Sequence, residues 1–147
     1  MKKYILAALV VATLAAVPMV ASNDRVITLA ELPRTAQDFA SKYFGTKQLS
    51  VVTLDNEVVS KTYDLIYADG TKLEFDGKGN WTEVSVPHGS SIPTGIVPAA
   101  IVSDLAKRFP QQSVQHIERK RRGYELELSN GLDLVYNNKG RFVRIDD

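Results

Sequence analysis

The chain has 147 residues, of which 44% are hydrophobic and 24% are charged, a balance typical of a globular protein and unlike disordered, collagen-like or coiled-coil chains. It contains no cysteine, which excludes disulfides, thiol nucleophiles, cysteinyl metal sites and a lipidated cysteine. The formal net charge is only +1, from 18 basic and 17 acidic residues, and therefore gives no indication of nucleic-acid binding.

The first residues have the three zones of an export signal. Lys2 and Lys3 precede an apolar run over residues 4–17, and small and polar residues follow. The run is shorter than the ~20 residues that a membrane-spanning helix needs. We therefore expect residues 1–22 to be a cleaved signal peptide, with cleavage after Ala21 as the alternative. The product would be periplasmic or secreted, without a membrane span.

The remaining sequence repeats itself. Residues 63–70 (YDLIYADG) run parallel to residues 124–131 (YELELSNG), and the match continues to Trp81 and Phe142. Upstream, Pro33 matches Pro98 and Phe44 matches Phe109. These matches predict two tandem repeats, about 32–86 and 97–146, joined by a linker over 87–96. Because a unit of this size is marginal alone, we expect one domain over 23–147 with a shared core.

Each repeat is predicted to contain one helix followed by four short strands. The first helix begins near Pro33 and stops at Gly45, and the second begins near Pro98 and stops at Pro110. The strands are expected at about 49–54, 60–68, 71–76 and 80–86, and at about 114–119, 123–129, 132–137 and 141–146. Asp69-Gly70 and Asn130-Gly131 predict two-residue hairpin turns with positive φ at both central residues.

Strand alternation predicts two unlike faces. The fold class expected is α+β: two antiparallel four-stranded meanders forming one curved sheet, with both helices on its apolar face. In the last strand of each repeat, hydrophobicity places Thr82 and Val84, and Val143 and Ile145, on the apolar side. The opposite, mostly acidic face is the candidate binding site, and its predicted residues are Asp64, Glu74, Trp81, Glu83, Glu125, Glu127, Asp133, Phe142 and Arg144.

A second candidate is the basic run Arg119, Lys120, Arg121 and Arg122 at a predicted hairpin tip. Such a cluster can hold an anionic glycan, a lipid head group or an acidic partner. Alternatively, it only keeps the tip solvated. The sequence leaves both readings open.

The motifs resemble a known family. The Leu32-Pro33 helix ending in Tyr43-Phe44, the strand 63–67, Asp69-Gly70 and residues 75–81 (FDGKGNW), repeated with Asn130-Gly131 and residues 138–142 (NKGRF), are similar to the PepSY-like, beta-lactamase-inhibitor-like periplasmic proteins of Bacteroides-type bacteria. The resemblance implies tandem helix-plus-four-strand units with a sheet curved away from its helices. In the inhibitor after which the family is named, the concave face of the sheet binds a loop of the enzyme.

No signature of catalysis is present: the sequence lacks a Gly-x-Ser-x-Gly elbow, a His-Glu-x-x-His motif and a phosphate loop. His88 and His116 are isolated, so we expect no metal and no cofactor. The sequence predicts an exported, non-enzymatic module that recognises a protein or peptide, and the resemblance suggests an envelope peptidase. The alternatives are a periplasmic carrier of a small molecule or glycan and a structural or oligomerising envelope protein.

Overall fold

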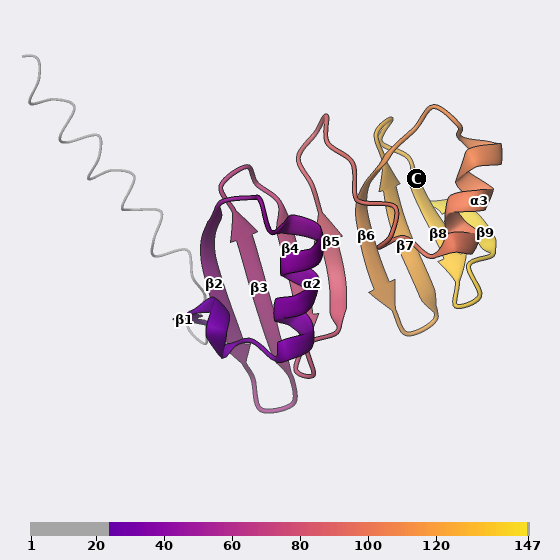
Figure 1. Ribbon diagram of the computed structural model, residues 1–147. Coiled ribbons are helices and arrows are strands. Elements are labelled where there is room, and N and C mark those ends of the chain that lie inside the picture. Colours follow the sequence, from indigo (N-terminus) through magenta and orange to yellow (C-terminus); the bar gives the residue numbers. More distant parts are fainter. Residues whose placement is uncertain (1–23, 147) are drawn as a thin grey trace, which may run out of the picture.

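The computed structural model describes residues 24–146, so the predicted signal peptide lies outside the described residues. Residues 24–146 form nine β-strands, two α-helices and one 3-10 helix, an α+β fold (Figure 1). The helices are η2 (Leu29–Glu31), α2 (Arg34–Phe44) and α3 (Ala99–Arg108). The strands are β1 (Asp24–Ile27), β2 (Leu49–Asn56), β3 (Lys61–Tyr67), β4 (Lys72–Asp76), β5 (Trp81–Ser85), β6 (Val114–Lys120), β7 (Gly123–Leu128), β8 (Asp133–Asn137) and β9 (Phe142–Asp146).

The strands form one open antiparallel sheet in which each strand pairs with the next along the chain. The two halves of the sheet join where β5 pairs with β6, with Val84 opposite Ile117. Both side chains are fully buried, so the junction is part of the core. Strand β1 was not predicted. It pairs with β2 at the edge of the sheet, and its four residues are too few to show strand alternation in the sequence.

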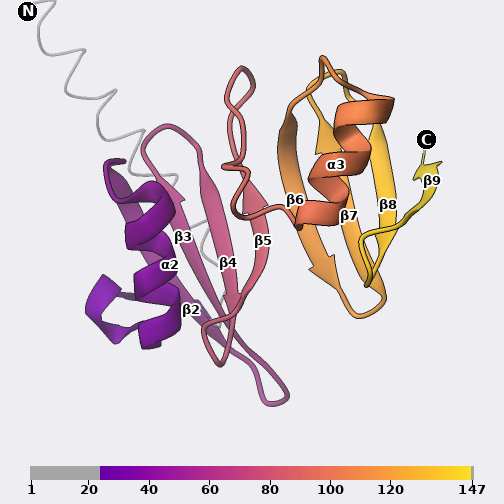
Figure 2. The same ribbon diagram turned by 45° about the vertical axis from the view of Figure 1, so that its right-hand side comes forward.

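The helices form where the apolar stripes predict them. Each begins directly after a proline, whose carbonyl oxygen accepts the first helical hydrogen bonds. Ala36, Ala40 and Phe44 are the buried residues of α2. In both ribbon views the two helices lie against the sheet, α2 against the half formed by β2 to β5 and α3 against the half formed by β6 to β9 (Figures 1 and 2). The Phe39 ring meets the Phe75 ring edge-on, with 5.6 Å between their centroids.

The Asp-Gly and Asn-Gly turns differ from the prediction. Tyr67 and Thr71 close a three-residue loop, because the Gly70 N–H donates to the Tyr67 carbonyl and the Tyr67 N–H donates to the Thr71 carbonyl. Of the two predicted central residues, Asp69 and Gly70, only Gly70 takes a positive φ, of 96°. Within residues 24–146, every residue with a positive φ is a glycine. Asp69 instead uses its Oδ1 atom to accept a 2.8 Å hydrogen bond from the Thr71 N–H. This side-chain acceptor stabilises the turn without a strained residue.

The segment between the halves is packed rather than extended into solvent. Ile92, Ile96 and Val97 are buried, and the Tyr43 hydroxyl of α2 donates to the Gly95 carbonyl at 3.3 Å. The buried side chains of both halves form one hydrophobic cluster, which lies on the side of the sheet that contacts the helices. We call this side the helix face and the opposite side the open face.

Candidate functional site

The strand register aligns five carboxylates in a single row across the open face. Each member lies directly opposite the next on the neighbouring strand, from β3 to β7. The row, called the acidic row below, consists of Asp64, Glu74, Glu83, Glu118 and Glu125. Like charges in directly opposite positions repel one another, so the row is an electrostatic cost in the free protein.

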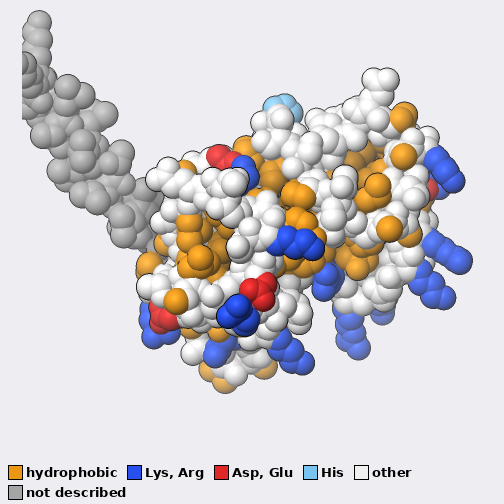
Figure 3. Space-filling view, in the orientation of Figure 1, with side chains coloured by type: hydrophobic (Ala, Val, Ile, Leu, Met, Phe, Trp, Pro, Cys, Tyr) orange, Lys and Arg blue, Asp and Glu red, His pale blue; other side chains and the backbone are white. Residues whose placement is uncertain are grey.

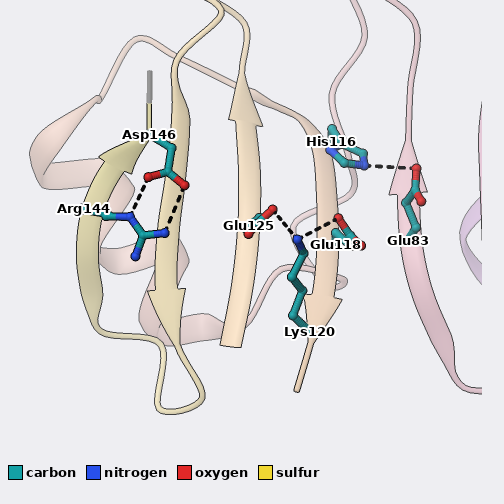
Figure 4. Close-up of polar contacts among 7 residues, drawn as sticks. All are labelled: Glu83, His116, Glu118, Lys120, Glu125, Arg144 and Asp146. Carbon is teal, nitrogen blue, oxygen red and sulfur yellow. Dashed lines mark hydrogen bonds and ion pairs between the residues drawn. The ribbon is translucent and has the colours of Figure 1, made fainter. Parts of the chain in front are cut away.

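Three contacts reduce this repulsion toward the second half of the sheet (Figure 4). Lys120 Nζ lies 2.8 Å from Glu125 Oε2 and 3.7 Å from Glu118 Oε2. His116 Nε2 lies 3.1 Å from Glu83 Oε1. The hydrogen bond to Glu125 is the main reason that the pKa of Lys120 is raised. The Lys120 ammonium group thus lies beside the carboxylates of β6 and β7, and the His116 imidazole lies beside that of β5.

At the other end of the row, Asp64 is half-buried, and its Oδ1 atom has no hydrogen-bond partner among the described residues. Burial raises the pKa of Asp64 from 3.8 to about 6, because the charged form loses hydration. Glu74, Glu83 and Asp24 raise it further, while Lys72 acts in the opposite direction. The first half of the row therefore carries the least compensated charge.

A second row of polar residues borders the acidic row on the open face. His116 on β6 lies opposite Glu127 on β7, and Glu127 lies opposite Asp133 on β8. Two shallow hollows open here, one of about 280 Å³ beside Glu127 and Asp133 and one of about 420 Å³ beside Glu83 and His116. The open face thus offers a broad polar surface with shallow relief.

Seven of the nine predicted face residues lie on this face: Asp64, Glu74, Glu83, Glu125, Glu127, Asp133 and Arg144. The prediction omitted Glu118, although the alternation of β6 already placed it on the same side as His116. Asp146, which pairs with Arg144 at 2.5 Å, was also omitted. Alternation from Arg144 within the predicted strand 141–146 already placed Asp146 on the same face.

The prediction for Trp81 and Phe142 is wrong, because both rings lie on the helix face. A β-bulge between Glu74 and Phe75 places Trp81 opposite Phe75, and its ring stacks near Phe39 of α2. Thr82, predicted inside, then shares the open face with Glu83 and donates from Oγ1 to Glu74 at 2.8 Å. One extra residue in a strand reverses the side on which the preceding residues point.

The same irregularity occurs in β9. A bulge between Val135 and Tyr136 places Phe142 opposite Tyr136, with 5.7 Å between ring centroids. The Arg108 guanidinium of α3 lies 4.2 Å from the centre of the Phe142 ring. Val143, predicted inside, is half exposed instead. Neither aromatic ring is available to anchor a partner on the open face.

The residues of the predicted basic run do not all lie on the same face of the sheet. Arg119 lies on the helix face, where its guanidinium is 4.2 Å from the centre of the Trp81 ring. Lys120 lies on the open face, and Arg121 and Arg122 form the exposed turn between β6 and β7. Figure 3 shows basic side chains projecting from this half of the molecule. Because successive strand residues point to opposite faces, the four residues do not form one patch.

Within the part of the chain that the structure describes, no group of three or more His, Asp or Glu side chains is arranged to hold a metal ion. Within residues 24–146, no helix is long and apolar enough to cross a bilayer.

Solved structures of high similarity come from Bacteroides. A "putative periplasmic protein" of the DUF2874 family from Bacteroides vulgatus is 35% identical, with a TM-score of 0.81, covering 86% of this chain and 99% of its own. A "putative calcium-regulated periplasmic protein" from Bacteroides thetaiotaomicron is 34% identical, with a TM-score of 0.80, covering 84% of this chain and 97% of its own. A third protein, from Bacteroides vulgatus and of unknown function, is 31% identical, with a TM-score of 0.79, covering 84% and 99%. No curated protein matches the sequence.

These similarities define a class of periplasmic α+β proteins, and they confirm the predicted localisation. The family model described as "Putative beta-lactamase-inhibitor-like, PepSY-like" matches residues 61–144. The chain belongs to this family, as its motifs predicted.

Proposed function

We propose that the protein is a non-enzymatic binding module of the periplasm, whose open face holds a basic segment of another protein or peptide. The acidic row carries this proposal. Its five carboxylates repel one another in the free protein, and a cationic partner relieves that repulsion. Four interstrand spacings give the row a length of about 19 Å, enough for about six residues of an extended chain.

The partner class follows from the shape of the face and from the family. Flat surfaces with shallow relief suit polypeptides better than small molecules, which prefer enclosed apolar pockets. The family description is inhibitor-like, which supports protein binding. An envelope peptidase with an exposed basic segment is therefore the first partner to test.

The alternative function, a carrier of a small molecule, has one supporting observation. An apolar cavity of about 290 Å³ lies between α3 and the linker, lined in part by Ile92, Val97, Leu105 and Phe109. Ligand pockets usually measure about 300 to 1,000 Å³, so this cavity is at the lower limit. An oligomerising role through Trp81 and Phe142 loses support, because Trp81 is buried beside Phe39 and Phe142 is partly covered by Arg108.

We also infer that the chain is a tandem duplication in one domain, with its two helices in equivalent positions. The irregularities of the two halves support this inference: the bulge after Leu49 recurs after Val114, and the bulge after Glu74 recurs after Val135. The turn acceptors recur as well. Asp76 Oδ1 accepts from two backbone N–H groups, and Asn137 Oδ1 does the same 61 residues later.

Peptide titration tests the binding function. An extended peptide with lysines at alternate positions should bind, and a matched glutamate peptide should not. The double variant Glu74→Gln/Glu118→Gln should weaken binding about tenfold and reduce its dependence on salt. The control Asp38→Asn/Glu57→Gln removes the same charge from exposed positions in α2 and the β2–β3 turn. Equal losses in both variants, or no binding of the lysine peptide, would refute the proposal.

A further inference from the structure

The acidic row ends beside a hollow of opposite charge. This hollow, of about 500 Å³, lies on the open face between the β6–β7 turn and β9. Four basic side chains and one acidic side chain line it: Lys120, Arg121, Arg122, Arg144 and Glu125. We call it the basic hollow. Glu125 is also the last member of the acidic row, so the two surfaces are continuous.

The turn that forms the hollow is constrained by Gly123. A Cβ atom at this position would lie 1.9 Å from the Tyr136 carbonyl oxygen, so no other residue fits without moving β8. Because β7 and β8 approach closely at Gly123 and Tyr136, backbone borders the hollow there, and the basic side chains lie around it. Arg121 and Arg122 directly precede Gly123, so the turn that carries them begins where β7 and β8 approach most closely.

The basic side chains differ in their availability. Lys120 is paired with Glu118 and Glu125, and Arg144 is paired with Asp146 (Figure 4). Among the ion pairs of residues 24–146, none involves Arg121 or Arg122. Both are exposed, and a guanidinium group can donate two parallel hydrogen bonds to a carboxylate. An oxyanion in the hollow would therefore be held first by these two arginines.

We propose that the basic hollow binds a carboxylate of the polypeptide whose basic residues lie over the acidic row. This inference rests on the proposed function, and it adds the direction in which the bound polypeptide lies along the acidic row. An anionic glycan or a lipid surface would meet the repulsion of Glu125 and the row beside it. A polypeptide instead carries both signs of charge on one chain, with its carboxylate either at the C-terminus or on an acidic side chain.

Three lysine peptides test the inference. Two share one sequence and have either a free or an amidated C-terminus, and the third is amidated and ends in an added glutamate. Isothermal titration of the full chain should show about tenfold tighter binding of a carboxylate-bearing peptide than of the plain amide. Whichever carboxylate gives the gain identifies its source. The gain should vanish in Arg121→Ser/Arg122→Ser and persist in Lys139→Ser/Arg141→Ser, which removes two exposed cations that do not line the hollow.

The outcomes separate the two proposals. Equal binding of all three peptides, or a gain that survives in Arg121→Ser/Arg122→Ser, overturns the carboxylate site and leaves the binding function standing. If none of the peptides binds, the proposed function fails. In that case, an NMR titration with acetate tests carboxylate binding in the basic hollow independently of the peptide. Chemical-shift changes confined to the amides around Gly123 and Glu125 support carboxylate binding there, and their absence overturns it.

Discussion

Replacing Asp64 with asparagine should stabilise the protein at neutral pH. Burial and the neighbouring carboxylates raise the pKa of Asp64 from 3.8 to about 6, so ionising it in the folded state is unfavourable. A carboxyl group with a raised pKa in the folded state contributes stability below its unfolded pKa, and this contribution is lost as the pH rises through the folded pKa. The contribution of Asp64 to the stability of the wild type should therefore disappear between about pH 4 and about pH 6, and the Asp64→Asn variant should lack this change.

The size of the effect follows from the shift. A change of about two pKa units corresponds to about 3 kcal/mol, which is an upper limit because water reaches this half-buried side chain. We expect a gain of about 1–2 kcal/mol in the free energy of unfolding above about pH 6, falling toward zero below about pH 4.

Urea denaturation of the wild type and Asp64→Asn across this pH range measures the gain directly. The control is Asp133→Asn, which removes the same charge from an exposed position of the open face and should change stability by less than about 0.5 kcal/mol. A pH-independent effect of Asp64→Asn, or an equal gain from Asp133→Asn, would show that burial and repulsion at Asp64 are not the cause.

Three further predictions concern the helix face. Trp81→Ala should lower the free energy of unfolding by about 3–5 kcal/mol in urea titrations, because the ring packs near Phe39. The folded variant should bind the lysine peptide as tightly as the wild type does. Weaker binding would show that the Trp81 ring contributes to the binding site. Gly79→Ala should cost about 1–3 kcal/mol, because its Cβ would lie 2.7 Å from Pro33 Cβ. Gly89→Ala, which has a similar φ but no close neighbour, should cost less in the same assay, and equal costs would remove the steric explanation. Tyr136→Phe removes a 2.8 Å hydrogen bond to Asp104 and should cost about 1–2 kcal/mol. In a double-mutant cycle this loss should largely disappear in an Asp104→Ala background, which lacks the acceptor.

Much of the secondary structure could be predicted because its signals are local. The stripe of Ala36, Ala40 and Phe44 predicts its helix, and the alternation over Tyr63, Leu65 and Tyr67 predicts the buried side of β3. The same alternation placed Asp64 and Glu125 on the opposite side. These assignments hold because neighbouring residues in one segment are enough to determine the direction in which each side chain points.

The errors lie where the direction depends on a partner strand. Trp81 and Phe142 follow turns, and each strand was expected to alternate without interruption from its first residue. The bulges opposite Glu74 and Val135 break that alternation. The ring of Trp81 gains contact with Phe39 and Arg119 on the helix face, which favours the bulged register over the regular one.

The amino-acid sequence alone therefore determined the two helices, most of the strands, the sign of charge on the open face and the family. The tertiary structure decided which charged side chains lie opposite one another on neighbouring strands. Whether Glu83 stands beside Glu118 depends on the pairing of β5 with β6 across an intervening helix and linker, and no local pattern encodes that register. The acidic row and the basic hollow at its end exist only because strand pairing brings distant carboxylates and arginines side by side.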